Sequence, residues 1–316
     1  MHTTGASLFF AVVYLHMFRG LLYGSYQKPK ELVWIFGCTI YLAMMAEGFL
    51  GYVLPYGQMS YWGAQVIISL FGAIPYIGES LELWVRGDYY ISGITVSRFF
   101  ALHVVALPLV LIALVFLHLV ALHEVGAGNP EGVDIEEHLD EDGVPLDSVP
   151  FFPYKVLNAL VAIGVFMTVF SIIMFFFPEG GGYFIEMANF QEANPLVTPE
   201  HIAPVWYYAP FYTMLRAIPD PLGGLIVMAA AVAIFFIVPW LDRSKVASIR
   251  YKGIFSKIAI TMFGVSFLTL GYLGTVGVTE VRKTMSVICT IIYFAYFLLM
   301  PIYTKYETTK EVPERL

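Results

Sequence analysis

Seven long apolar stretches dominate this chain of 316 residues and restrict what it can fold into. A helix that crosses a bilayer needs about 20 consecutive apolar residues, and each stretch is close to that length. Only 13% of the residues are charged, too few to cover a soluble domain of this size. The sequence therefore predicts an all-α, multi-span transmembrane helix bundle, with spans near residues 3–23, 33–54, 99–122, 155–177, 222–241, 254–274 and 284–304.

A shorter apolar segment, near residues 62–77, is interrupted by Gly72 and Pro75. It is too short for a span and predicts a helix that lies on the membrane surface or re-enters the bilayer. Cys38 and Cys289 each lie within an apolar stretch, which is typical of buried hydrophobic side chains rather than of a disulfide.

The basic residues indicate how the spans are oriented. They cluster after the first, fifth and last spans, in connections that lie on the same side if the spans alternate. Lysine and arginine are enriched on the cytoplasmic side of membrane proteins, so we expect this side to be cytoplasmic. An acidic loop at residues 125–150 falls on it as well. This loop is interpreted as a solvated segment, with a docking surface for a partner as the alternative.

Four histidines lie inside two of the predicted spans. His2 and His16 are 14 residues apart in the first span, which brings them within roughly 40° of the same helix face and about 21 Å apart along the axis. His103 and His118 are 15 residues apart in the third span, about 60° from the same face and about 22 Å apart. Each helix therefore presents one histidine near either membrane surface.

These histidines predict a haem site near each surface. Ionisable residues inside a membrane are costly and usually functional. If His2 pairs with His103, and His16 with His118, each pair provides two axial ligands for a haem iron. Two haems held between these two helices would carry electrons across the bilayer. The chain has no Cys-x-x-Cys-His motif, so the haems are expected to be non-covalent haem b.

Other residues fit the haem hypothesis. Gly37 and Gly51 are also 14 residues apart, in the second span, and glycine lets a flat macrocycle approach the backbone. The alternative is ordinary packing of small residues between helices. Arg19 lies three residues after His16, and Arg98 five residues before His103, where each suits a haem propionate. For Arg19, a simple anchor at the positive side is the alternative.

Several long motifs in order resemble cytochrome b of the quinol-oxidising cytochrome bc complexes, over nearly the whole chain. The regions around His2 and His16 resemble the second helix of that family, and those around His103 and His118 its fourth helix. The third helix and the loop after it are matched by Gly51–Gly63 (GYVLPYGQMSYWG) and by AIPYIG at residues 73–78. The loop and helix around the quinol-oxidising site are matched by NPL at 194–196, PEHI at 199–202, WY at 206–207 and LRAIP at 215–219.

The resemblance implies a di-haem subunit of a quinol–cytochrome c oxidoreductase that works by a proton-motive Q cycle. Quinol, either ubiquinol or menaquinol, would be oxidised at an outer site. One electron would pass to a Rieske-type iron–sulfur protein and on to a c-type cytochrome. The other would cross both haems and reduce quinone at an inner site. His2 and His103 would hold the outer, low-potential haem, and His16 and His118 the inner, high-potential one.

The resemblance also implies an assembly and a set of quinone-site residues. The complex would be a homodimer in the inner membrane of a bacterium, with no nucleic acid as a partner. His123 matches a quinone-contacting histidine of the inner site; the alternative is a surface histidine at a span end. The outer site would be lined by Tyr52, Gly63, Pro204, Trp206, Tyr207 and Tyr212. For the aromatic residues of this set, a belt at the membrane interface is the alternative.

Three departures from the family pattern stand out. Val205 replaces a glutamate that accepts a quinol proton in the family, so the proton must leave through Tyr52, Tyr212, water or the iron–sulfur partner. Glu200 and His201 lie nearby in sequence and are further candidates. Ala159 stands where an inner-site aspartate is expected. The 15-residue histidine spacing resembles the chloroplast-type relative, whereas the unbroken chain through the later helices resembles a bacterial long form.

The family has eight spans, and this chain is expected to start partway through the second, at His2. Residues 1–124 are interpreted as the N-terminal haem-binding part, 125–150 as the acidic cytoplasmic loop, and 151–316 as the C-terminal part with the quinol-site loop. Two other functions remain as alternatives. One is a two-haem membrane anchor of a different dehydrogenase; the other is a transporter or channel with histidines in a proton relay.

Overall fold

The computed structural model describes residues 1–135 and 138–314; residues 136 and 137 of the acidic loop lie outside the described part. Within it, all seven predicted spans are confirmed as long apolar helices. They are α1 (His2–Tyr23), α2 (Glu31–Val53), α5 to α6 (Gly93–Val125), η4 to α7 (Phe151–Phe176), α9 (Pro221–Leu241), α10 (Ile254–Thr275) and α11 (Glu280–Leu298). The described residues form no β-sheet, only two isolated bridges.

The last span is shifted relative to its predicted range of 284–304. It begins earlier because the Thr279 side chain accepts a hydrogen bond from the backbone of Arg282 and so caps the helix at Glu280. It ends at Leu298, and a separate short helix, α12 (Met300–Tyr306), follows. Pro301 at the start of α12 has no backbone N–H and cannot continue the preceding helix.

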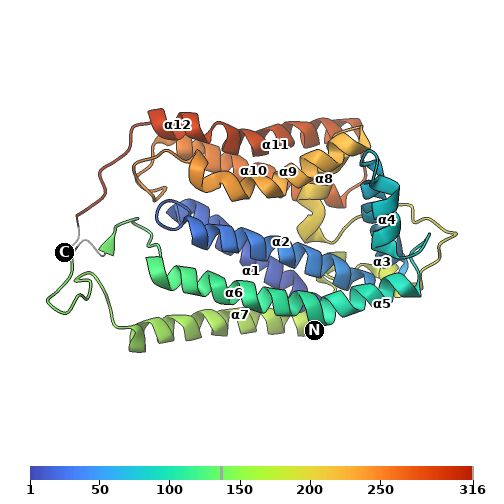
Figure 1. The fold of residues 1–316 in the computed structure, drawn as a ribbon, viewed down its shortest axis with the longest axis horizontal. Coiled ribbons are helices and arrows are strands. Elements are labelled where there is room, and N and C mark those ends of the chain that lie inside the picture. Colours follow the sequence, from blue (N-terminus) through green and yellow to red (C-terminus); the bar gives the residue numbers. More distant parts are fainter. Residues whose placement is uncertain (136–137, 315–316) are drawn as a thin grey trace.

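The connections on one side of the bundle are built from short helices. The apolar segment predicted near 62–77 is not among the spans; it forms α3 (Gln58–Ser69) and the 3-10 turn η1 (Leu70–Ala73). After it come α4 (Gly78–Arg86) and, later in the chain, η7 (Trp206–Tyr208) and α8 (Ala209–Ala217). The smaller 3-10 turns η5 (Gly180–Gly182) and η6 (Met187–Phe190) lie between α7 and η7. All of these elements gather at one end of the bundle (Figure 1).

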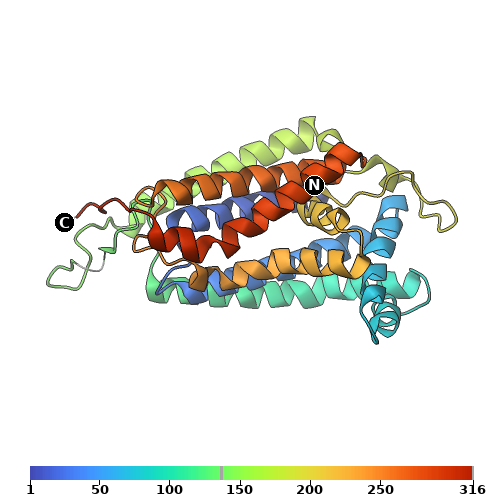
Figure 2. The same cartoon turned by 90° about the horizontal axis from the view of Figure 1, so that it is seen from above.

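The long helices run along the long axis of the molecule in two groups (Figures 1 and 2). In the first, α2 packs along α6, and α7 lies against α1. In the second, α10 packs on α8 and α11, and α9 packs on α8. Contacts of α9 with α2, and of η7 with α1, join the two groups. Helix α7 thus lies with the helices that precede it in sequence.

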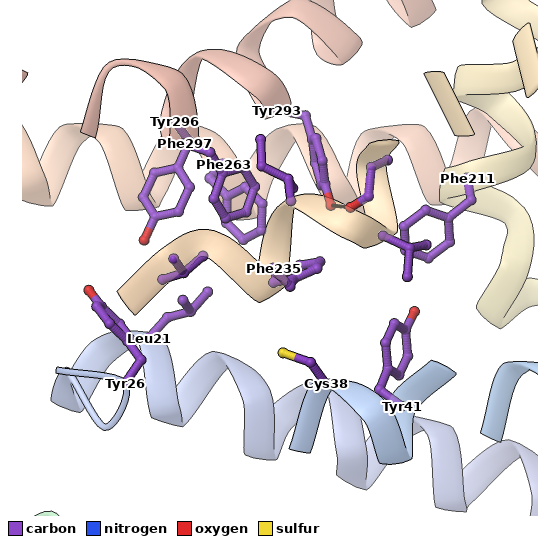
Figure 3. Packing of buried hydrophobic residues seen from close by; sticks show 14 of the residues in the cluster. Leu21, Tyr26, Cys38, Tyr41, Phe211, Phe235, Phe263, Tyr293, Tyr296 and Phe297 are labelled. Atoms are coloured by element: carbon purple, nitrogen blue, oxygen red, sulfur yellow. Dashed lines mark hydrogen bonds between the residues drawn. The ribbon is translucent and has the colours of Figure 1, made fainter. Parts of the chain in front are cut away.

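A core rich in aromatic side chains fills the space between the two groups (Figure 3). One of its hydrogen bonds pairs a helix carbonyl that a proline leaves without its usual donor. Pro239 lies inside α9 and has no N–H to offer the carbonyl of Phe235, one turn earlier. The indole N–H of Trp34 donates to that carbonyl at 2.7 Å. A neighbouring helix thereby satisfies a backbone group that the apolar surroundings would otherwise leave unpaired.

A buried ion pair closes the end of the bundle opposite α8. The Lys252 ammonium bonds to the Asp242 carboxylate, which also accepts hydrogen bonds from Tyr26 at 2.7 Å and from Gln27 at 3.0 Å. The two charged side chains are only 5% and 0% exposed. Burial acts to raise the pKa of Asp242, but the Lys252 charge and these hydrogen bonds outweigh burial and hold the pKa below its usual value. The ion pair lies within the α9–α10 connection, and the hydrogen bonds from Tyr26 and Gln27 to Asp242 attach that connection to the one between α1 and α2.

Candidate functional site

The four histidines of the spans meet in two pairs. The rings of His2 and His103 have centroids 6.1 Å apart, and those of His16 and His118 have centroids 6.3 Å apart. A bond between a metal ion and an imidazole nitrogen is about 2 Å long, so two imidazoles on opposite sides of one ion have centroids roughly 6 Å apart. Each pair therefore has the separation that a single axially bound iron needs.

The number of ligands also suits haem. The part of the chain that the structure describes has no group of three or more His, Cys, Asp or Glu side chains that could hold a metal ion. Each pair supplies only two ligands, so the remaining positions around an ion must come from a group such as a porphyrin. Helices α1 and α6, which carry three of the four histidines, are not closely packed against each other; α6 packs on α2 instead.

The 15-residue spacing of His103 and His118 is explained by a π-helical turn, η2 (Leu102–Ala106), between α5 (Gly93–Ala101) and α6 (Leu107–Val125). Pro108, the second residue after this turn, cannot donate to the carbonyl of Val104, which favours a local departure from the α-helix. A π turn absorbs one extra residue. The two histidines therefore face the same side more closely than the 60° offset predicted for a regular helix.

A hydrogen bond orients the ring of His103. Its Nδ1 lies 2.9 Å from both the backbone carbonyl oxygen and a carboxylate oxygen of Glu47. Metal-binding histidines usually donate their second ring N–H to such a group, which fixes the tautomer and leaves Nε2 free to bind the metal. Sequence reasoning missed Glu47, although a carboxylate inside the apolar 33–54 stretch was a usable signal.

The two glycines of α2 stand opposite the histidine rings. A Cβ atom on Gly51 would lie 2.4 Å from Cε1 of His103, and one on Gly37 would lie 3.3 Å from Cε1 of His118. The sequence predicted that these glycines admit a macrocycle. The structure shows that they make room for the rings of His103 and His118, and the admission of a macrocycle stays a prediction.

We expect Gly51→Ala to lower haem content more than Gly37→Ala does. The added methyl group at residue 51 overlaps a ring that Glu47 also holds, whereas the contact at residue 37 is only tight. Loss of about half of the total haem is expected for Gly51→Ala, measured as haem per polypeptide after pigment extraction. Gly164→Ala is the control, since a Cβ there meets nothing within 4 Å. Equal haem content in all three variants would contradict the tight fit.

An apolar cavity of about 560 Å³ lies between α2, α3, α8 and α9. Four of the six residues predicted for the outer quinol site line it: Tyr52, Gly63, Pro204 and Tyr212. Val205 also lines it, and other lining residues were not predicted, among them Phe49, Tyr208, Phe211 and Met228. These four residues lie on α2, η7, α8 and α9, and a motif around residues 204–212 could not have included Phe49 or Met228. The volume is in the range of pockets that bind small organic ligands.

Trp206 and Tyr207 are not among the residues that line the cavity; they contact α1 instead. The indole N–H of Trp206 donates to the Ser7 hydroxyl at 3.2 Å. The Tyr207 ring stacks on Phe10 with centroids 3.9 Å apart, and its backbone carbonyl accepts a hydrogen bond from Tyr14. These contacts fix η7 to α1 and position the cavity-lining residues on either side of it.

The remaining predicted residues lie at helix ends. Arg19 is exposed, with its guanidinium 5.7 Å from the ring centroid of Tyr23. Arg98 is exposed and donates to the carbonyl of Trp84 at 3.1 Å. His123 is exposed in the last turn of α6, and Ala159 is exposed on α7.

The cavity contains no carboxylate among its lining residues; its titratable groups are Tyr52, Tyr208 and Tyr212. Tyr208 donates to the carbonyl of Met45 at 2.7 Å, and Tyr212 to that of Ile202 at 3.1 Å. Tyr52 lies within electrostatic range of the Glu186 carboxylate, which sequence reasoning did not single out. Glu200 and His201 are exposed and do not line the cavity.

Comparison with known proteins shows the family of this chain. The family model described as Cytochrome b(N-terminal)/b6/petB matches residues 7–210, and that described as Cytochrome b(C-terminal)/b6/petD matches residues 192–294. A cytochrome b of Allochromatium vinosum is 55% identical over all of this chain and 78% of its own length. A cytochrome b of Rickettsia bellii is 47% identical over all of this chain and 76% of its own length.

A solved structure described as hyperthermophilic respiratory Complex III is similar in fold. It superposes with a TM-score of 0.89 at 35% sequence identity, over 97% of this chain and 78% of that chain. The similarity spans both helix groups and thus the histidine pairs and the cavity together. This integral membrane protein belongs to the cytochrome b family, as the resemblance of its motifs predicted.

Proposed function

We propose that the two histidine pairs hold two haem b groups, and that the apolar cavity binds quinol for oxidation. As a cytochrome b, the chain is a subunit of quinol–cytochrome c reductase, the enzyme of respiratory complex III. The observation that carries the haem proposal is the ring separation of 6.1 and 6.3 Å in the two pairs, with a glycine opposite each α5–α6 histidine. When bound, the haems supply one-electron transfer between the two membrane surfaces.

Specific side chains are proposed to bind the haems and to shape the quinol site. His2 and His103 would hold one haem and His16 and His118 the other, and Arg98 and Arg19 would bind haem propionates near the two surfaces. Glu47 keeps the ring of His103 in the orientation that binds iron. Because the cavity is lined mainly by apolar and aromatic groups, it excludes water from the quinol ring.

Membership of the cytochrome b family supports two partner proteins and an inner site where quinone is reduced. The quinol cavity lies at the end of the bundle formed by α3, α4 and α8, opposite the basic connections. We infer that this end faces outward from a bacterial inner membrane, where a Rieske-type iron–sulfur protein and a c-type cytochrome receive one electron. His123, at the other end of α6, lies where quinone would be reduced in a Q cycle. Either ubiquinone or menaquinone is proposed as the substrate, and the complex is proposed to be a homodimer.

Oxidation of quinol releases protons, and we propose that the Tyr52 hydroxyl relays one of them to the Glu186 carboxylate, which accepts it in place of the glutamate that Val205 replaces. Tyr52 lines the cavity, and Glu186 is the carboxylate whose charge acts on it. We expect Glu186→Gln to slow quinol oxidation about 100-fold, since a positioned base typically contributes at least that much. Glu200→Gln and His201→Gln serve as controls and should leave the rate and its pH dependence unchanged. If a control substitution slowed quinol oxidation strongly and Glu186→Gln did not, Glu200 or His201 would be the proton acceptor instead.

A cavity-filling variant tests whether quinol binds there. Gly63 lines the cavity, and a Cβ at this position meets nothing within 4 Å, so Gly63→Phe adds a ring to the open space without a clash at its base. We expect at least a tenfold loss of quinol-oxidation activity with both haems retained. Gly164→Phe adds the same ring on α7, where a Cβ also meets nothing, and should keep full activity. Normal activity and normal KM in Gly63→Phe would place the quinol elsewhere.

A further inference from the structure

A second, much smaller cavity lies at the same end of the bundle, between α8, α10 and α11. Its volume of about 20 Å³ has room for one water-sized group. None of its lining residues contributes to the histidine pairs or to the quinol cavity. They are Thr213, Arg216, Ala217, Leu273, Val278, Arg282, Lys283 and Ser286.

Three positive side chains converge on this cavity. Arg216 donates one N–H to the carbonyl of Leu273 at 2.6 Å, and Arg282 donates one to the carbonyl of Gly277 at 2.8 Å. A guanidinium carries five N–H donors, so both arginines retain several. Across the described residues, neither arginine nor Lys283 forms an ion pair within 4.0 Å. Arginine does not lose its charge in proteins, so this cluster stays positive at any physiological pH.

The acidic groups near the cavity do not neutralise it. Asp220 follows α8, but its carboxylate accepts the backbone N–H of Gly223 and caps α9. Glu280 begins α11 and is exposed, and it does not line the cavity. Converging like charges repel one another, and a bound anion would relieve this repulsion. The arrangement therefore suits a negatively charged ligand.

The location indicates which anion binds. The cavity lies where α10 ends and α11 begins, so the termini of these two spans place it at the level of a membrane surface. Val281 and Met285 on α11, next to the cavity residues, are 71% and 43% exposed and apolar, as expected for a surface that faces lipid. The fork of an arginine matches the geometry of phosphate oxygens, and basic pockets between transmembrane helices bind lipid head groups.

We propose that Arg216, Arg282 and Lys283 bind a phosphate group, supplied by an anionic phospholipid whose acyl chains lie along the exposed face of α11. The cavity accommodates one phosphate oxygen, and the rest of the head group lies outside it.

Arg216 is not chosen for the first substitution, because it has other contacts. It holds the carbonyl of Leu273, and its guanidinium lies 5.0 Å from the ring centroid of Tyr212, which lines the quinol cavity.

The test uses the whole complex that contains this chain, carrying Arg282→Gln/Lys283→Gln. The control, Arg243→Gln/Lys245→Gln, removes two exposed charges at the opposite end of the bundle. Each complex is placed in nanodiscs of phosphatidylcholine with phosphatidylglycerol, extracted with a mild detergent, and its retained phospholipids are counted by native mass spectrometry. We expect the cavity variant to lose one phospholipid per chain relative to wild type and to the control. Arg282→Lys, which keeps the charge, serves as a second variant and should retain part of the binding.

A second arm separates the two sources of phosphate. Complexes held in a neutral detergent are incubated with inorganic phosphate, and bound phosphate is measured by equilibrium dialysis. Phosphate uptake that the cavity variant loses, without any difference in retained lipid, supports the phosphate site with free phosphate as its ligand. Equal lipid retention and equal phosphate uptake in wild type and in both cavity variants would overturn the proposal.

Discussion

Replacing His103 by alanine is expected to remove one of the two haems and to abolish quinol–cytochrome c reductase activity. His103 faces His2 at a centroid distance of 6.1 Å, and we expect that His2 as a single remaining ligand would not hold the group. His118→Ala should remove the other haem for the same reason, since His118 faces His16 at 6.3 Å. The ratio of haem to polypeptide should fall from two to one in each variant.

The control for these variants is His138→Ala. His138 is exposed in the acidic loop and lies in none of the spans, so its loss should change neither haem content nor activity. Reduced-minus-oxidised spectra distinguish the two variants if the remaining haem differs in midpoint potential. Retention of both haems in His103→Ala would show that this histidine is not an iron ligand, and the proposed pairing would fail.

Replacing Lys252 by methionine is expected to lower the free energy of unfolding by about 3–5 kcal/mol. That is the usual cost of removing one partner of a buried ion pair, because the other charge is left without compensation. The Asp242 side chain is fully buried and would keep only its hydrogen bonds from Tyr26, Gln27 and Ser244. Denaturant unfolding in mixed micelles, followed by tryptophan fluorescence, measures the change.

Two further variants show whether the loss of stability comes from the unpaired charge of Asp242. Asp242→Asn/Lys252→Met removes both charges and should recover most of the stability, since a neutral pair leaves no isolated charge. Lys245→Met removes an exposed charge from the same connection and should cost less than about 0.5 kcal/mol. If Lys252→Met were no more destabilising than Lys245→Met, the buried ion pair would not stabilise this end of the bundle.

The same pair predicts how stability depends on pH. The pKa of Asp242 is lower in the folded protein than in the unfolded chain, where it is about 3.9. The stabilisation from its ionised form is therefore fully present above about pH 4 and is lost as pH falls through the lower folded-state pKa. Unfolding measured between pH 5 and pH 3 should show a loss of stability in the wild type that is smaller in Asp242→Asn.

The fold was largely predictable because the bilayer imposes strong rules on sequence. Each span must be long, apolar and helical, so all seven could be located by length and composition alone. The histidine pairs could be proposed because His2, His16, His103 and His118 are ionisable groups in apolar stretches, at spacings that repeat across two helices. Such a pattern depends only on helix geometry, which the membrane fixes.

The missed features depend on contacts between helices, which a single sequence does not display. The bond from Trp34 to the carbonyl of Phe235 follows from Pro239, but the partner that replaces the missing N–H comes from another helix. Glu47 was overlooked although its carboxylate lies inside a span, and its contact with His103 joins residues 56 positions apart. The π turn at residues 102–106 changes the direction of His103 in a way that a regular helix cannot predict.

The cavity proposed to bind quinol was likewise only partly predictable from the sequence. A resemblance to family motifs identified Tyr52, Gly63, Pro204 and Tyr212, which line the cavity, together with Trp206 and Tyr207, which contact α1. Neighbouring residues on a 3-10 turn point in different directions, so membership of one motif does not place two side chains in one site. Tyr208 and Phe211 follow directly and do line the cavity.

The most direct test of the central claim is the number of haem b groups per chain, measured by pigment extraction and protein quantification on the purified complex, with a redox titration of the same sample. Two histidine pairs predict two b-type haems per chain, with two different midpoint potentials and with spectra typical of bis-histidine iron. A single haem would contradict one of the pairs. The absence of b-type haem would overturn the assignment of both pairs, and with it the proposed path of electrons across the membrane.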